Sequence, residues 1–195
     1  MSSSSDAKRA LRASLVAARA RLTPEERRAR SLAIAGRVEA LEAVRSARTL
    51  AAYTALGAEV DPLALVHACA ARGVRVVFPR IAAGERLLTF AGCAPNELVR
   101  GALGAAEPPA SAAEVPLDAI DAVVLPGVAF TPDGHRLGRG GGYYDATLAR
   151  MPRAFTVGLA FEVQLVPTLP FEPHDVPLDA IATEARLLRP RGESD

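Results

Sequence analysis

The sequence predicts an α/β fold in which helices cover both faces of a mostly parallel β-sheet, giving a three-layer α/β/α domain that spans residues 1–195. Short apolar segments alternate along the chain with segments of helical periodicity, and this order of elements is typical of a parallel sheet covered by helices. Half of the 195 residues are hydrophobic and 23% are charged, which is the composition of a globular protein. A chain of this length buries a substantial core within a single domain.

The first helix is expected at about residues 6–22. Leu11, Leu15 and Leu22 recur at helical spacing, and Lys8, Arg12 and Arg19 fall beside this stripe on the helical wheel. The Ser-, Ala- and Arg-rich composition of the segment is also that of an organelle transit peptide. Because the leucine stripe provides a face that a core would bury, we interpret the segment as a structural helix.

Two further helices begin at clear start signals. Thr23-Pro24-Glu25-Glu26 combines an N-cap, a proline at the first helical position and a capping-box acid, which predicts a helix to about residue 44. Asp61-Pro62 opens another helix, and Gly73 closes it. A fourth helix is expected at residues 143–150.

Short apolar runs bounded by turn residues predict the strands. They are residues 49–53, 74–78, 87–90, 122–125, 155–159 and 181–183. Pro79 should stop the second strand, because proline cannot donate to the ladder. Residues 101–116 contain Ala, Pro and Gly without periodicity and are expected to form a loop or loose crossover. The tail from about residue 190 should be disordered.

The remaining bulk properties exclude several classes of protein. A formal net charge of +1 gives no broad electrostatic footprint for nucleic acid. No run of about 18 apolar residues predicts a membrane span. Cys69 and Cys93 lie far apart without metal-binding spacing, so we interpret them as buried thiols in a reducing compartment. We expect a cytoplasmic monomer with neither nucleic acid nor a membrane as a partner.

The segment that indicates chemistry follows the apolar strand at residues 122–125. Its glycines, at positions 138 and 140–142, let backbone amides approach a ligand closely, and a helix starting near Tyr143 would add its positive end. Arg136 and Arg139 bracket this turn and present planar donors suited to phosphate oxygens. Asp145 lies just inside the helix, where a carboxylate would hold Mg²⁺ beside the phosphates. Neither a Walker A loop nor a Rossmann fingerprint is present.

The whole segment Arg136-Leu137-Gly138-Arg139-Gly140-Gly141-Gly142-Tyr143-Tyr144-Asp145 resembles the signature of the 5-formyltetrahydrofolate cyclo-ligase family. The resemblance extends from about residue 8 to residue 184 in the family's order. Further matches are the basic segment at residues 8–12, Tyr53 followed by residues 59–61, and segments 78–80, 158–164 and 174–179. Residues 84–116 carry no family landmark.

The resemblance implies an enzyme that uses ATP to cyclise 5-formyltetrahydrofolate to 5,10-methenyltetrahydrofolate, with Mg²⁺ as cofactor and ADP and phosphate as the other products. Arg139 and Tyr143 are the expected catalytic residues. The residues expected to bind folate are Tyr53, Glu59, Tyr143 and Tyr144, and those expected to bind the metal ion are Asp145 and Asp175. The residues expected to bind ATP are Lys8, Arg9, Arg12, Arg136, Leu137, Gly138, Arg139, Gly140, Gly141, Gly142, Tyr143 and Tyr144.

Two other functions fit the residues less well. One is an enzyme that uses the glycine turn for a sugar phosphate without ATP, and the other is a regulatory module that binds a nucleotide without chemistry. Arg136, Arg139, Tyr143, Tyr144 and Asp145 together count against both, since a mere phosphate cradle does not need this set.

Overall fold

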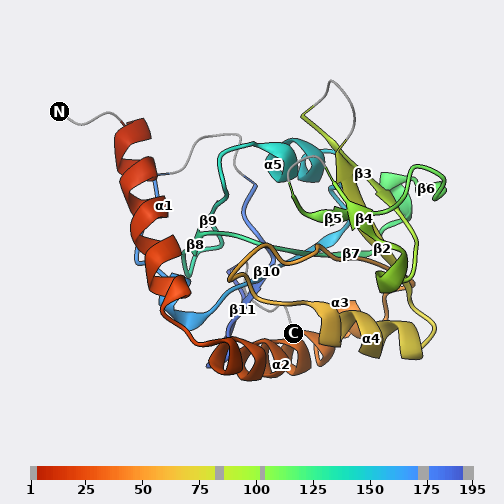
Figure 1. Cartoon of the computed structure of the whole chain (residues 1–195), viewed down its shortest axis with the longest axis horizontal. Helices are drawn as coiled ribbons and strands as arrows, with labels where there is room; N and C mark the ends of the chain where they lie inside the picture. The colour runs from red at the N-terminus through yellow and green to blue at the C-terminus, as the bar shows by residue number, and fades with distance from the viewer. Residues whose placement is uncertain (1–3, 82–85, 102–103, 171–175, 191–195) are drawn as a thin grey trace.

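The computed structural model describes residues 4–81, 86–101, 104–170 and 176–190. A mixed sheet forms its centre (Figure 1). It has eight strands in the order β12-β11-β10-β7-β1-β2-β3-β6. The helices are α1 (Ser4–Ala20), α2 (Pro24–Glu39), α3 (Glu42–Arg45), α4 (Leu63–Ala71) and α5 (Tyr143–Leu148), with short 3₁₀ helices η1 (Pro95–Glu97), η2 (Leu117–Ala119) and η3 (Glu162–Gln164). The strands of the large sheet are β1 (Thr49–Ala51), β2 (Arg75–Ile81), β3 (Leu88–Ala91), β6 (Glu114–Val115), β7 (Ala122–Leu125), β10 (Phe155–Leu159), β11 (Ala180–Ala182) and β12 (Leu187–Leu188). Two small hairpins pair β4 (Val99–Arg100) with β5 (Ala106–Glu107), and β8 (Ala129–Phe130) with β9 (Arg136–Leu137).

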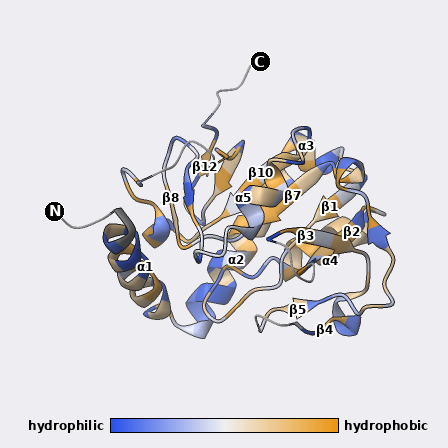
Figure 2. Cartoon of the chain, turned by 90° about the horizontal axis from the view of Figure 1, so that it is seen from above, coloured by the Kyte–Doolittle hydropathy of each residue, from blue (hydrophilic) through white to orange (hydrophobic). Residues whose placement is uncertain are grey.

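The predicted α/β class is confirmed. Strands β11, β10, β7, β1 and β2 run parallel, and antiparallel strands extend the sheet at both edges. The apolar residues concentrate in the central strands (Figure 2). These strands are buried because each is covered on two faces, and this is why they appear as continuous apolar runs in the sequence.

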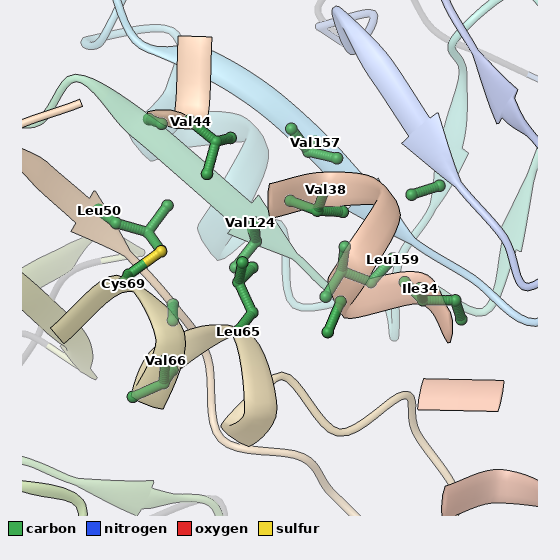
Figure 3. Close-up of a cluster of buried hydrophobic side chains, with 14 of the residues drawn as sticks. Ile34, Val38, Val44, Leu50, Leu65, Val66, Cys69, Val124, Val157 and Leu159 are labelled. Atoms are coloured by element: carbon green, nitrogen blue, oxygen red, sulfur yellow. The ribbon is translucent and has the colours of Figure 1, made fainter. Parts of the chain in front are cut away.

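Each face of the sheet has its own core. On one face, α2, α3 and α4 pack Val38, Val44 and Leu65 against Val124 (Figure 3). On the other face, Leu148 of α5 packs in a cluster with Val123 and Leu125. Alternate residues of β7 thus enter opposite cores, as the period of two requires.

Three predicted boundaries were wrong. The helix expected to reach residue 44 ends at Glu39, because Leu41 takes an extended conformation and turns its side chain into the core before α3 begins. Strand β2 runs through Pro79 to Ile81, since from Phe78 onward it pairs with β3 and no longer with β1. The supposed loop at residues 101–116 contains β5 and β6, each two residues long.

Helix α1 stands apart from the layers at one end of the sheet (Figure 1). Its Leu11 and Leu15 pack on a small cluster that includes Ala129 of β8 and Leu137 of β9. Two of the three leucines of the predicted stripe therefore attach α1 to the β8–β9 hairpin, whereas Leu22 lies beyond the helix and packs in the core that α2 covers. The helix presents Lys8 and Arg12 to the segment that follows the hairpin.

Both cysteines are free thiols, as expected. Cys69 is buried and Cys93 is half-buried, and burial raises the pKa of each thiol. Among the helices of the described ranges, none combines the length and the hydropathy that a membrane crossing requires.

Candidate active site

A cavity of about 410 Å³ opens where the central parallel strands end. Tyr53 follows β1, Gly127 follows β7, and Pro79 belongs to the last part of β2. Ligands of open α/β sheets bind beyond the carboxyl ends of the strands, so the position is that expected for an active site. Its other lining residues are Lys8, Arg12, Thr54, Leu56, Glu59, Ile81, Arg86, Leu88, Ala105, Ala106, Glu107, Pro126, Arg136, Leu137, Gly138, Arg139, Gly140, Gly141, Gly142, Tyr143, Tyr144, Asp145 and Pro170.

One wall of the cavity is the glycine-rich turn, residues 138–142, which leads from β9 into α5. Gly140 has φ +103° and Gly142, the N-cap of α5, has φ +71°, a region that residues with a Cβ rarely adopt. A Cβ on Gly141 would lie 2.8 Å from the ring of Tyr143. Glycines at these positions therefore let the exposed backbone of the turn line the cavity.

The floor beside this wall is fixed by Gly127. A Cβ there would lie 2.5 Å from Cζ of Phe130, whose side chain is fully buried and has no room to move. The carbonyl oxygen of Gly127 accepts a hydrogen bond from Nε2 of Gln164 at 2.8 Å and one from Nη1 of Arg19 at 3.4 Å. Arg19 and Gln164 were not among the predicted site residues, because only the folded chain brings them to Gly127.

Arg136 and Asp145 form an ion pair at the foot of the glycine-rich turn. Nη2 of Arg136 donates to Oδ1 of Asp145 at 2.6 Å, and the Arg136 side chain is only 5% exposed. The guanidinium also lies over the ring of Tyr144, 5.5 Å from its centroid. Burial raises the pKa of the Tyr144 hydroxyl, and the charge of Arg136 opposes that rise. The ion pair therefore holds the carboxylate of Asp145 in place on the cavity wall.

Arg139 joins the glycine-rich turn to the opposite wall of the cavity, which includes Leu56 and Glu59. Its Nε and Nη2 lie 3.0 and 2.9 Å from Oε1 of Glu59, and Nη2 also donates to the carbonyl of Leu56 at 3.3 Å. The Glu59 side chain is 5% exposed, whereas that of Arg139 is 56% exposed. The second carboxylate oxygen of Glu59 accepts from the backbone N–H of Leu56 at 2.9 Å. A residue expected at the phosphates and one expected at the folate are thus in direct contact.

The basic residues of α1 reach the same cavity. Nε of Arg12 donates to the carbonyl of Gly138 at 2.9 Å, and both Arg12 and Lys8 line the cavity. Arg9 is not among the lining residues; it is 80% exposed and pairs with Asp6 at 2.8 Å. Two of the three predicted basic residues of α1 therefore face the cavity in this structure.

Tyr53 borders the cavity beside Glu59. It is 3% exposed, and its hydroxyl donates to the carbonyl of Val60. Burial raises the pKa of Tyr53 well above its ordinary value, and the charge of Glu59 raises it further. The hydroxyl is neutral at physiological pH.

Of the two residues predicted to bind metal, one falls within the described part of the chain. Asp145 lies on the cavity wall, and Asp175 lies outside the described residues. Within the described ranges, no group of three or more His, Cys, Asp or Glu side chains is arranged to hold a metal ion by itself.

A cavity at the carboxyl ends of parallel strands, walled by a glycine-rich turn and basic side chains, is typical of an α/β enzyme that acts on a phosphate-bearing ligand. The model of the 5-formyltetrahydrofolate cyclo-ligase family matches residues 4–184, and the chain belongs to this family.

Relatives and solved structures agree with this assignment. The 5-formyltetrahydrofolate cyclo-ligase of Escherichia coli K12 is 36% identical over 173 residues, covering 85% of this chain and 94% of the relative. The mouse cyclo-ligase is 28% identical over 192 residues, covering 91% of this chain and 94% of the relative. The solution structure of Aquifex aeolicus 5,10-methenyltetrahydrofolate synthetase superposes with a TM-score of 0.83 at 30% identity, covering 96% of this chain and 95% of the other.

Proposed function

We propose that this chain cyclises 5-formyltetrahydrofolate to 5,10-methenyltetrahydrofolate at the expense of ATP, with both substrates held in the cavity at the ends of β1 and β7. The observation that carries the proposal is the contact between Arg139 on the glycine-rich turn and Glu59 on the opposite wall, within 3.0 Å. This contact brings the glycine-rich turn, proposed to bind phosphate, within a few ångströms of the carboxylate proposed to bind folate. Transfer of a phosphoryl group between two bound substrates requires such proximity.

The reaction has to turn a poor leaving group into a good one. The formyl oxygen attacks the γ-phosphorus of ATP, the bond from that phosphorus to the bridging oxygen breaks, and ADP leaves. N10 then attacks the formyl carbon, the carbon–oxygen bond breaks, and phosphate leaves with the former formyl oxygen. Loss of the N10 proton leaves one carbon bridging N5 and N10. Phosphoryl transfer of this kind depends on positioning and charge stabilisation.

The glycine-rich turn supplies the phosphate site. Its backbone amides, with Lys8 and Arg12 from α1, surround the anion. Arg139 is exposed enough to turn from Glu59 to the transferring phosphoryl group, where we assign it the main catalytic role. Arg136 is nearly buried and bonded to Asp145, so its contribution is to hold that carboxylate beside the phosphates. Arg9 would join only after releasing Asp6.

Asp145 fits a role in holding Mg²⁺. Its Oδ1 is held by Arg136, and its side chain is 26% exposed on the cavity wall, so carboxylate oxygen would be available to a cation bound beside the phosphates. Mg²⁺ typically binds through one or two carboxylates together with substrate phosphates, and Asp175 is our second proposed ligand. When bound, the ion neutralises charge that develops on the phosphoryl oxygens.

The opposite wall supplies the folate site. The carboxylate oxygens of Glu59 accept hydrogen bonds, so Glu59 would bind N–H groups on a polar edge of the folate. Tyr53, Tyr143 and Tyr144 line the cavity nearby and offer ring surface for the planar part of the substrate. Tyr143, next to the turn, is our second proposed catalytic residue and would orient the formyl group.

One assay tests the function. Purified protein is mixed with 5-formyltetrahydrofolate and Mg·ATP, and near-ultraviolet absorbance is followed for the methenyl product. We expect a rise that needs ATP, and transfer of ¹⁸O from a labelled formyl group into phosphate. Nucleotide binding without product would instead support a regulatory module, and turnover of a sugar phosphate without ATP would support the other enzyme class.

The oligomeric state and the location of the enzyme complete the proposal. We propose that the enzyme is a monomer and that it acts in the cytoplasm, although a relative from Arabidopsis thaliana is named as mitochondrial. Light scattering on the purified protein and fractionation of cells that express it would decide these points.

A further inference from the structure

Thr147 carries a buried hydroxyl that the proposed chemistry does not use. It lies in α5 and is 1% exposed. Its Oγ1 donates to the carbonyl of Tyr143, one turn earlier in the helix, at 2.7 Å. The same oxygen accepts from the backbone N–H of Leu88 in β3, 59 positions away, at 3.0 Å. A buried hydroxyl needs such partners, and here they join a helix to a strand.

Both elements that this hydroxyl joins line the active-site cavity. Helix α5 contributes Tyr143 and Asp145. Strands β2 and β3 contribute Pro79, Ile81 and Leu88, a surface that we call the β2–β3 wall. Within this wall, Ile81 pairs with Leu88 across the two strands. The hydrogen bond to the backbone of Leu88 therefore connects the helix that carries two proposed functional residues to a separate wall of the same cavity.

Helix α5 depends on the rest of the fold for its position. It spans six residues, Tyr143–Leu148, and a helix this short is not stable by itself in water. Leu148 and Leu88 are buried in one apolar cluster, against which Tyr143 packs. Burial of apolar surface has no preferred direction, whereas a hydrogen bond restricts both a distance and an angle. The bond from Leu88 to Thr147 therefore fixes where α5 lies along β3.

The proposed reaction makes this position important. Asp145 is our proposed ligand for Mg²⁺ beside the phosphates, and Tyr143 is proposed to orient the formyl group. A shift of α5 along β3 would move both residues relative to a substrate that lies against the β2–β3 wall. A displacement of about 1 Å at a reacting centre can lower the rate on the order of 100-fold.

We propose that Thr147 is a positioning residue: its hydroxyl fixes α5 against β3, so that Tyr143 and Asp145 keep the placement that phosphoryl transfer needs. The inference rests on the function proposed above. Thr147 is not among the residues that line the cavity, and it acts through the backbone of Tyr143 and Leu88.

The variant Thr147→Val tests this role, because valine has nearly the shape of threonine but no hydroxyl. It leaves the N–H of Leu88 without its partner while the cavity lining stays the same. We expect kcat for ATP-dependent formation of the methenyl product to fall about 10- to 100-fold. KM for ATP and for 5-formyltetrahydrofolate should change much less, since the hydroxyl contacts neither substrate and its loss acts on the transition state.

Two controls separate positioning from stability. Thr147→Ser keeps the hydroxyl and loses a buried methyl group, so it should lower Tm yet retain most of kcat. Thr156→Val is the matched control. Thr156 in β10 is 5% exposed, does not line the cavity, and its Oγ1 donates to Oδ2 of Asp179 at 2.8 Å and accepts from the N–H of Asp179 at 3.0 Å. Its replacement should lower Tm and leave kcat as in the wild type.

Hydrogen exchange gives a readout that needs no turnover. The amide of Leu88 is protected by its bond to Thr147, so in Thr147→Val its exchange should become faster by a larger factor than that of the other amides of β3. Thr147→Ser should keep the protection. If Thr147→Val does not fold, Thr147→Ala takes its place with the same expectations.

The outcomes separate the two proposals. Absence of methenyl product with the wild type would overturn the proposed function itself. If the wild type turns over, a Thr147→Val variant with normal kcat would overturn the role of Thr147. So would equal losses of kcat in Thr147→Val and Thr147→Ser, or in Thr147→Val and Thr156→Val, because the hydroxyl at position 147 would then have no effect of its own. Unchanged exchange at Leu88 in Thr147→Val would contradict the contact on which the role depends.

Discussion

The glycine-rich turn makes a quantitative prediction at Gly140. Its φ of +103° is one that alanine rarely adopts, but a Cβ there would meet nothing closer than the guanidinium of Arg12 at 3.8 Å, an ordinary contact. Gly140→Ala therefore perturbs the backbone conformation of the turn without a clash. The turn is exposed, so the variant can relax to another conformation in the free enzyme.

The size of the effect follows from the cost of that conformation. Holding a residue with a Cβ in such a region costs about 1–3 kcal/mol. If the turn must readopt its conformation around the phosphates, the cost is met in the transition state, and each 1.36 kcal/mol corresponds to roughly tenfold in rate. We expect kcat/KM for ATP to fall about 5- to 150-fold, with little change in Tm.

Gly73→Ala is the matched control. Gly73 has φ +81° and open space around its Cβ position, and it lies between α4 and β2, away from the cavity. There the strain should appear as a loss of stability, about 2–4 °C in Tm for each kcal/mol, with normal kinetics. The assay is ATP-dependent formation of the methenyl product. A Gly140→Ala variant with wild-type kcat/KM for ATP would refute the role given to the turn.

Three other predictions concern charge and hydrogen bonds. Asp145→Asn should raise KM for Mg·ATP on the order of tenfold or more while leaving folate affinity nearly unchanged, and equal losses for both substrates would undercut the metal assignment. Burial and the charge of Glu59 raise the pKa of Tyr53 above its ordinary value of 10.0, so the contribution of Tyr53 to stability is complete below about pH 10 and is lost as the pH rises further. The Tm of the wild type should therefore fall above that pH, and Tyr53→Phe should make the fall less steep. An unchanged slope of Tm against pH in Tyr53→Phe would count against this role. Gln164→Leu leaves the carbonyl of Gly127 without its 2.8 Å bond and should cost about 1–3 kcal/mol in thermal unfolding, whereas an unaltered Tm would speak against that role.

The centre of the fold could be predicted from the sequence because its signals are local. Strands β7 and β10 lie where their apolar runs predicted, at Ala122–Leu125 and Phe155–Leu159. The edge strands β6 and β12 were missed because they become strands only by pairing with segments distant in the sequence or in the sheet. The two residues of β6 pair with β3, and those of β12 pair with β11, without any periodicity of their own.

The candidate site likewise combines features that local sequence reveals with features that depend on tertiary contacts. The glycine-rich turn and its flanking arginines could be found because they are contiguous. The different surroundings of the two arginines could not, since Arg136 is buried by Tyr144 and Asp145 whereas Arg139 reaches Glu59, 80 positions away. The contacts of Arg19 and Gln164 are made with a carbonyl group, which no side-chain pattern reveals.

A crystal structure with a non-hydrolysable ATP analogue and Mg²⁺ tests most directly whether the glycine-rich turn holds the triphosphate. We predict the phosphates along the amides of residues 138–142, with Arg139 turned from Glu59 to a phosphate oxygen. A nucleotide bound elsewhere, with Arg139 still paired to Glu59, would contradict the account.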